Sequence, residues 1–116
     1  MNRFVLLRHS TAKDQYHWDF LFEESGGCKT FSASQKPVDE VQRSGTLQSV
    51  VTPLSDHRLV YLDYEGPVSN NRGFVKRLDF GTYQTIAGTI HFQGRFYAGT
   101  IDLRDYVLVM KDRKNK

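Results

Sequence analysis

The segment Leu7–Glu23, LRHSTAKDQYHWDFLFE, holds the densest chemistry of the chain and indicates how it folds. From Trp18 onward, aromatic residues alternate with residues of other kinds, a pattern typical of a β-strand. On such a strand His17 and Asp19 project from the same face, with side-chain origins roughly 6.5–7 Å apart. A metal ion or a phosphate placed between these two side chains lies within reach of both.

His9 follows the apolar run Phe4–Leu7, and residues 10–15 after it are polar. This polar stretch is suited to a capped helical turn, which we expect to fold His9 back beside His17. Two imidazoles and one carboxylate suit Mn, Fe, Zn or Ni and leave coordination positions for water or substrate. The same spacing also fits a surface pair of His17 with Asp19 and an ordinary histidine at a strand end.

The length of 116 residues, with 39% hydrophobic and 13% aromatic residues, predicts one globular domain. No apolar run approaches the length of a membrane span. The first residues, Met1–Phe4, lack the features of a secretory signal, so we expect a cytoplasmic protein without membrane contact. The lone Cys28 cannot form an intramolecular disulfide and is expected to be a buried strand residue.

The formal charge of +3 and the pI near 9.1 are compatible with a nucleic-acid partner. Much of the excess lies in residues 111–116, which we expect to form a disordered basic tail after a single domain at residues 1–110. Such a tail adds only nonspecific attraction to phosphates.

Nearly every other segment has the pattern of a strand, and turn-forming residues separate the segments. The predicted strands are Asn2–Leu7, Trp18–Glu24, Cys28–Ser34, Thr46–Leu54, Arg58–Tyr64, Phe74–Phe80, Thr85–Gln93, Arg95–Leu103 and Tyr106–Met110. We expect a hairpin turn at Ser25–Gly27, a helical turn at Val38–Arg43 and a long loop at residues 65–73, where sites are commonly built. The fold prediction is therefore mainly all-β, a small antiparallel β-barrel with one or two short helical turns, because closure removes exposed sheet edges.

Several segments share, in order, the sequence pattern of a known family. They are Phe4–Glu23, Lys29–Phe31, Asp56–Gly66 (DHRLVYLDYEG), Gly73–Thr82 and Gly94–Val109, which together cover most of the chain. On these residues the chain resembles the 3′-phosphoesterase domain of bacterial non-homologous end-joining DNA ligase D. It is also similar to the short stand-alone proteins related to that domain, the DNA polymerase/ligase N-terminal domain proteins.

The resemblance implies a compact β-barrel whose metal, typically Mn, is held by His9, His17 and Asp19, with Zn, Co or Ni as alternatives. It places His57 and Tyr61 at the scissile phosphate. It further implies a phosphodiesterase and phosphomonoesterase that trims 3′ ends of DNA or of DNA carrying terminal ribonucleotides, leaving a 3′-hydroxyl for ligation. The expected partners are such nucleic-acid ends and a separate DNA ligase or polymerase, and the expected oligomeric state is a monomer.

General chemistry gives these residues the same roles. A divalent metal neutralises phosphate charge and lowers the pKa of bound water. His57 can protonate a leaving oxygen or bind a phosphate oxygen as imidazolium, and Tyr61, predicted four residues further on a strand, can donate a hydrogen bond to the same phosphate. The alternatives for these two residues are a turn histidine and a packing aromatic.

The chain departs from the family pattern at the residues that hold phosphate. Seven residues separate His9 from His17, more than the family usually has. Leu21 stands where the family has an arginine, and a second arginine and a glutamate correspond by position to about Ser49 and Ser55. Bidentate arginine contacts to phosphate are strong and not easily replaced.

Three other arginines are candidates to replace the missing ones, namely Arg58, Arg72 and Arg77. Arg72 is the first choice, because its loop follows Tyr61 and the adjacent Gly73 lets the backbone approach a ligand closely. The alternative for Arg72 is an exposed loop residue without a ligand.

Two rival functions remain open at this point. The sequence His17-x-Asp19 with a distant His57 or His91 also has the form of the facial triad of non-haem iron oxygenases, but 116 residues leave little room for their larger jelly roll. The second rival is a nucleic-acid-end or metal-binding module of a repair complex that has lost turnover along with its arginines.

Overall fold

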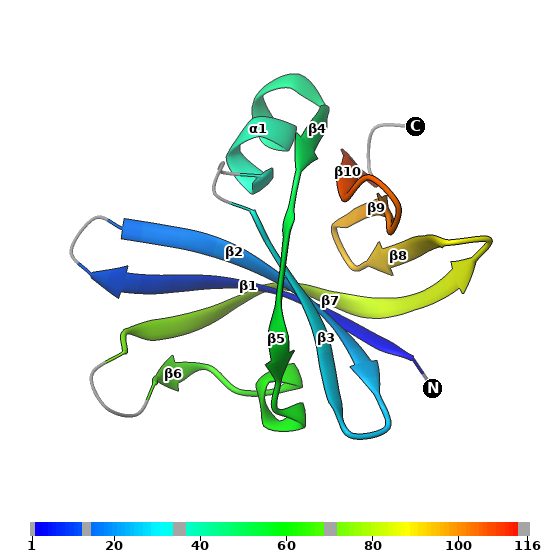
Figure 1. Cartoon of the computed structure of the whole chain (residues 1–116). Coiled ribbons are helices and arrows are strands. Elements are labelled where there is room, and N and C mark those ends of the chain that lie inside the picture. Colours follow the sequence, from blue (N-terminus) through cyan, green and yellow to red (C-terminus); the bar gives the residue numbers. More distant parts are fainter. Residues whose placement is uncertain (1, 13–14, 34–36, 69–71, 114–116) are drawn as a thin grey trace.

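The computed structural model describes residues 2–12, 15–33, 37–68 and 72–113, and shows a mainly β protein with one helix and one 3-10 turn (Figure 1). The elements in chain order are β1 (Arg3–Ala12), β2 (Gln15–Glu24), β3 (Gly27–Ala33), α1 (Pro37–Ser44), β4 (Thr46–Val50), β5 (Thr52–His57), η1 (Leu59–Leu62), β6 (Gly66–Pro67), β7 (Phe74–Ile86), β8 (Thr89–Gly94), β9 (Tyr97–Asp102) and β10 (Val107–Asp112). Within these described ranges, no helix has the length and apolar character needed to cross a membrane.

All strands belong to one antiparallel sheet in the order β4-β10-β9-β8-β7-β1-β2-β3-β5, with β6 paired to β7 outside this path. The sheet curls into a half-barrel, which confirms the predicted fold class. Its two end strands, β4 and β5, are consecutive in the chain and only Val51 separates them. One run of backbone therefore pairs with β10 on one side and with β3 on the other, and spans the opening of the curl (Figure 1).

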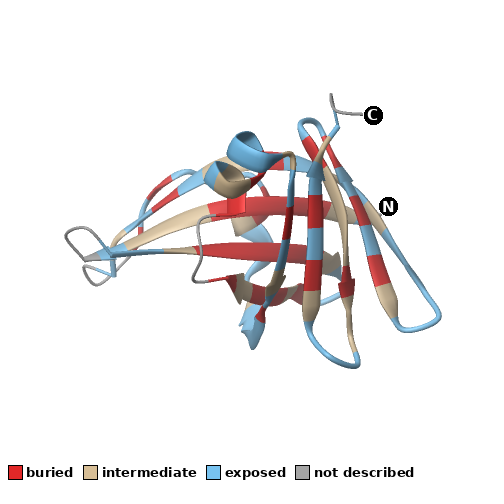
Figure 2. Ribbon diagram, turned by 90° about the horizontal axis from the view of Figure 1, so that it is seen from above, coloured by how far each residue is buried: buried red, intermediate tan, exposed pale blue. Residues whose placement is uncertain are grey.

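The middle of the sheet is covered on both faces, so β1 and β2 are buried over much of their length (Figure 2). Alternate residues Phe4 and Leu6 point into the larger core, together with aromatic rings from β2, β3 and β8. Val5 and Leu7 point the other way, into a smaller core that includes η1. The continuous apolar run at the start of the chain follows from this arrangement, because a strand buried on both faces has no polar side.

The structure corrects the predicted helical turn after His9. β1 continues to Ala12 and turns back as a β-hairpin into β2, while residues 13–14 lie outside the described part of the chain. The polar residues after His9 could cap a helical turn, but they form strand instead. The reason is that β1 is paired on both edges here, with β2 on one and with β7 on the other.

The strand predicted at Arg58–Tyr64 is also wrong, since this segment forms the 3-10 turn η1. Its backbone bonds are local, from the Tyr61 amide to the Arg58 carbonyl and from the Asp63 amide to the Val60 carbonyl. Alternating side chains alone do not make a strand where no neighbouring strand is available to pair with it.

Other elements differ mainly in their bounds. The helical turn at Val38–Arg43 is α1, and the predicted strand end at Ser34 lies outside the described residues. The strand predicted at Thr85–Gln93 is wrong as a single strand, because a turn at residues 87–88 divides it between β7 and β8. β7 instead extends the predicted strand Phe74–Phe80 through Gly81, where a Cβ would lie 2.0 Å from the Gln93 carbonyl oxygen of β8. The end of the domain also shifts, since β10 reaches Asp112 and Arg113 donates to the Gly94 carbonyl. Residues 114–116 of the expected tail lie outside the described part.

Asp79 holds the turn between β8 and β9. It is 1% exposed, and its carboxylate accepts hydrogen bonds from the backbone amides of Phe80, Arg95, Phe96 and Tyr97. Gly94 leaves room for this carboxylate, because a Cβ there would lie 2.0 Å from Asp79 Oδ2. One buried side chain thus accepts hydrogen bonds from four backbone amides at this turn.

Removing the Asp79 carboxylate should therefore destabilise the protein strongly. We expect Asp79→Ala to lower the free energy of unfolding by at least about 3 kcal/mol, because several buried amides lose their acceptor. Asp102→Ala is the matched control, since among the described residues its carboxylate accepts one amide, that of Arg104, in an exposed hydrogen bond, and its loss should cost no more than about 1 kcal/mol. Urea denaturation followed by circular dichroism measures both, and equal losses would contradict the assigned role.

Candidate functional site

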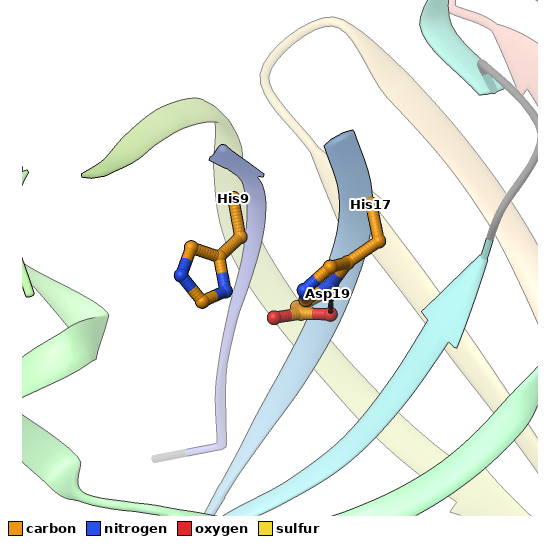
Figure 3. A group of neighbouring side chains, drawn as sticks. All are labelled: His9, His17 and Asp19. Atoms are coloured by element: carbon orange, nitrogen blue, oxygen red, sulfur yellow. Dashed lines mark hydrogen bonds and ion pairs between the residues drawn. The ribbon is translucent and has the colours of Figure 1, made fainter. Parts of the chain in front are cut away.

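The β1–β2 hairpin brings three chemistry-bearing side chains together. In its register His9 lies directly opposite His17, and Asp19 follows two residues later on the same face of β2. The two imidazole rings lie 4.7 Å apart between centroids and are inclined by 71°. Figure 3 shows all three side chains on one side of the hairpin.

These three residues could hold a metal ion. Each offers one ligand atom, and the three atoms lie within 4.8 Å of one another. The structure thus brings together the three predicted ligands, although by strand pairing and not by a helical turn. Because the pairing register sets the contact, the long spacing between His9 and His17 only lengthens the hairpin beyond them.

The orientation of His9 is set by the loop before β7. Its Nε2 atom lies 2.8 Å from the Arg72 carbonyl oxygen, to which it donates a hydrogen bond. The other ring nitrogen, Nδ1, is then left with its lone pair on the side of His17 and Asp19 (Figure 3). Histidines that bind metals are commonly held in this way by a carbonyl on the second nitrogen.

Asp19 is a buried carboxylate at the base of the group, 1% exposed. His17 Nδ1 donates to its Oδ1 over 2.8 Å, and His57 Nε2 lies 3.5 Å from its Oδ2. Burial would raise the pKa of Asp19, but the two histidines outweigh it and lower this pKa to about 2. The carboxylate is therefore charged, and Oδ2 is buried without a hydrogen-bond partner among the described residues. This donor set fits a divalent cation.

His57 ends β5 and faces the same carboxylate. Its backbone amide donates to Thr30 Oγ1 over 3.3 Å, and its Nδ1 donates to the Ser55 carbonyl over 3.3 Å. The ion pair with the Asp19 carboxylate raises the pKa of His57 despite partial burial. The imidazolium form is consequently favoured, and it carries a proton on the nitrogen that faces the site.

A cavity of about 590 Å³ opens over this group. It collects almost every residue predicted for the site, and its walls are His9, His17, Leu54, Asp56, His57, Arg58, Tyr61, Val68, Arg72 and Val75. The Tyr61 ring lies 5.8 Å from that of His57, and the Arg58 guanidinium lies 5.9 Å from the Tyr61 ring centre. The turn η1, and not a strand, carries Tyr61 to this wall.

The three positions where phosphate-holding residues were expected, Leu21, Ser49 and Ser55, do not line the cavity. Leu21 is fully buried in the smaller core beneath Asp19, and Ser49 lies on β4, outside the cavity walls. Ser55 is exposed and contributes only its carbonyl, which orients His57. Arg77 and the rival ligand His91 are not among the residues that line the cavity.

Two polar residues of β3 support the site and were not predicted. Thr30 holds the His57 backbone, and Ser32 Oγ lies 3.4 Å from His17 Nδ1. Their spacing of two within β3 is the signal that could have found them, because it places both hydroxyls on one face.

Comparisons with known proteins do not assign the chain to a family. No protein-family model matches the chain, and no curated protein sequence matches it.

Gly73 decides how closely the Arg72 loop approaches β1. Its φ of 101° lies in the left-handed region, and a Cβ there would lie 1.7 Å from the Ser10 carbonyl oxygen. Gly73→Ala should push the Arg72 carbonyl away from His9 and lower Mn affinity by at least about tenfold, the usual scale for lost outer-shell contacts. Calorimetric titration with Mn measures this.

The control is Gly88→Ala, at a φ of 81° with no atom within 4 Å of the new Cβ. It carries the same kind of backbone strain without the collision and lies in the β7–β8 hairpin, far along the chain from the site. A similar loss of Mn affinity in both variants would remove Gly73 from the site.

The lowered pKa of Asp19 predicts a pH-dependent contribution to stability. A carboxylate with a depressed folded-state pKa stabilises the protein above its unfolded pKa of about 3.9, and the contribution disappears as the pH falls through about 2. At pH 5.5, where His57 is protonated, Asp19→Asn should cost about 2 kcal/mol in the presence of EDTA. The cost should shrink steadily between pH 4 and 2, as measured by urea denaturation. A cost independent of pH would contradict the charged pair.

Proposed function

We propose that the protein is a metal-dependent phosphoesterase that trims the 3′ ends of DNA or RNA–DNA strands before ligation. The observation that carries the proposal is one cavity lined by His9, His17, His57, Arg58 and Arg72, with the buried Asp19 carboxylate in contact with His17 and His57. A group of metal-binding residues by itself is found in proteins of many functions. A metal group beside a protonated histidine and cationic side chains fits the hydrolysis of a phosphate ester.

The metal would be held by His9, His17 and Asp19. Mn is the first candidate, and Zn, Co and Ni suit the same mixed nitrogen and oxygen donors. When bound, such an ion supplies charge neutralisation for the phosphate and an activated water. The buried Asp19 charge and the carbonyl on His9 keep the ligands in place before any ion arrives.

His57 would serve as the general acid. The Asp19 carboxylate raises its pKa and so favours the protonated ring, and its Nδ1 is already hydrogen-bonded to the Ser55 carbonyl. The proton on Nε2 is then available to a leaving oxygen in the cavity. Tyr61, with its ring against that of His57, would donate its hydroxyl proton in a hydrogen bond to the same phosphate.

Arg58 and Arg72 would replace the missing phosphate clamp. Both line the cavity, one from the start of η1 and one from the loop before β7. They thus approach the phosphate from another side than an arginine at position 21 would, because Leu21 points into the core. Guanidinium groups at the rim also draw a nucleic-acid backbone toward the site.

The alternative function is a module that binds nucleic-acid ends or a metal without turnover. The burial of Leu21 favours it, since this position offers the phosphate no cation at all. The two functions predict the same metal site and differ only in whether a bound 3′ end is cleaved.

The deciding experiment is an Mn titration followed by NMR, with paramagnetic broadening read at each backbone amide. A primer–template with a 3′-phosphate and one with a 3′-ribonucleotide are then added to the same sample. We expect broadening around His9, His17, Asp19 and His57 and trimming of both ends. Broadening without cleavage would favour the binding module, and diffuse broadening would end the site assignment.

Two variants separate metal binding from chemistry. His17→Ala should abolish Mn binding, whereas His57→Ala should leave Mn bound and reduce turnover by at least about 100-fold, the usual scale of general acid catalysis. His91→Ala is the control, because this exposed histidine on β8 does not line the cavity, and it should change neither property. Undiminished Mn affinity in His17→Ala would refute the metal site.

A further inference from the structure

A second pocket lies on the opposite face of the β1–β2 hairpin from the metal group. Strand alternation sends His9 and His17 to one side and Arg8, Tyr16 and Trp18 to the other. The pocket has a volume of about 240 Å³, and its remaining walls are Val38 and Asp39 of α1 and Leu78 of β7. The proposed phosphoesterase mechanism uses none of these side chains.

Arg8 places a guanidinium group at the wall of this pocket. Its guanidinium carbon lies 5.4 Å from the centre of the Tyr16 ring, so the cation is stacked on an aromatic face. A guanidinium carries several N–H donors in one plane and can pair with two adjacent acceptors of a ligand.

Aromatic and apolar groups form the walls. Trp18 is 6% exposed and lies at the inner end, whereas Tyr16 is 43% exposed and lies at the rim. The two rings are 6.4 Å apart between centroids and inclined by 38°. Aromatic rings beside a basic group are the usual means by which proteins hold unpaired bases of single strands.

Size and charge narrow the choice of ligand. The volume of 240 Å³ lies below the range of about 300–1,000 Å³ for pockets that take whole small molecules, so the pocket suits a single base. Asp39 at the wall disfavours a phosphate or an acidic peptide. Guanine satisfies both charged groups, because its O6 and N7 accept from arginine while its 2-amino group donates to a carboxylate.

We propose that this pocket binds an unpaired guanine base of a single-stranded nucleic acid. Of the described residues, none pairs with β2 on its β3 edge before Trp18, so a strand can pass around this edge toward the metal group. Only the path of the strand from this pocket to the metal group rests on the proposed function. Base binding itself requires neither metal nor cleavage.

Trp18 is the only tryptophan of the chain, so its fluorescence reports this pocket directly. The probes are trinucleotides with a central guanine, adenine or thymine between two thymines, titrated in EDTA. We expect a saturable change in fluorescence and tightest binding for guanine. Arg8→Gln and Tyr16→Leu should each weaken binding about tenfold, as expected for the loss of one base contact. Asp39→Ala should remove the preference for guanine over adenine.

Arg104→Gln and Phe96→Leu are matched controls on exposed residues outside the pocket, and they should leave the titration unchanged. NMR shifts at the amides of Val38 and Asp39 in the wild-type protein give a second measurement that needs no variant. No response of Trp18 and of these amides would overturn the proposal. So would an equal response to an acidic peptide, or an unchanged titration in both Arg8→Gln and Tyr16→Leu.

These experiments test the guanine pocket and the proposed phosphoesterase function independently of each other. Cleavage of a 3′-phosphate primer without any trinucleotide response would overturn the guanine pocket and leave the phosphoesterase intact. A guanine-selective response without cleavage would support the pocket and count against the phosphoesterase.

Discussion

The antiparallel pairing of β1 with β2 is the constraint on which the rest of the structure depends. Its register sets His9 against His17 and, by strand alternation, assigns each neighbouring side chain to one face or the other. A slip by one residue would turn His17 and Asp19 into the larger core and bring Trp18 and Phe20 to the cavity. The aromatic residues of β2 therefore protect the site, because burying them holds the register that presents the histidines.

The buried charge of Asp19 is the second constraint. A carboxylate this deeply buried is unfavourable unless cations or donors compensate it, and here His17 supplies a hydrogen bond while His57 supplies a charge. These contacts join the hairpin to β5, which is distant in the chain. The same contacts raise the pKa of His57, so the residue that stabilises Asp19 in the folded protein has its own protonated form favoured in return.

Much of the fold and the composition of the site could be predicted from the sequence, because they depend on local periodicity. The spacing of His17 and Asp19 fixed their common face, and the apolar alternation fixed the strand that carries them. The placement of His9 was predicted for the wrong reason, since only the pairing of β1 with two neighbouring strands shows that no helical turn follows it. Tyr61 lies at the cavity on a 3-10 turn, although the alternation of side chains in this segment had predicted a strand.

What the sequence could not show was the contact between segments distant along the chain. His57, Arg58 and Arg72 reach one cavity only because η1 and the loop before β7 pack against the smaller core that Leu7 and Leu21 fill. Leu21 supplies apolar surface under Asp19, and so supports the group of residues that could hold a metal ion. The same small core that anchors η1 thus also carries the strand on which Asp19 lies.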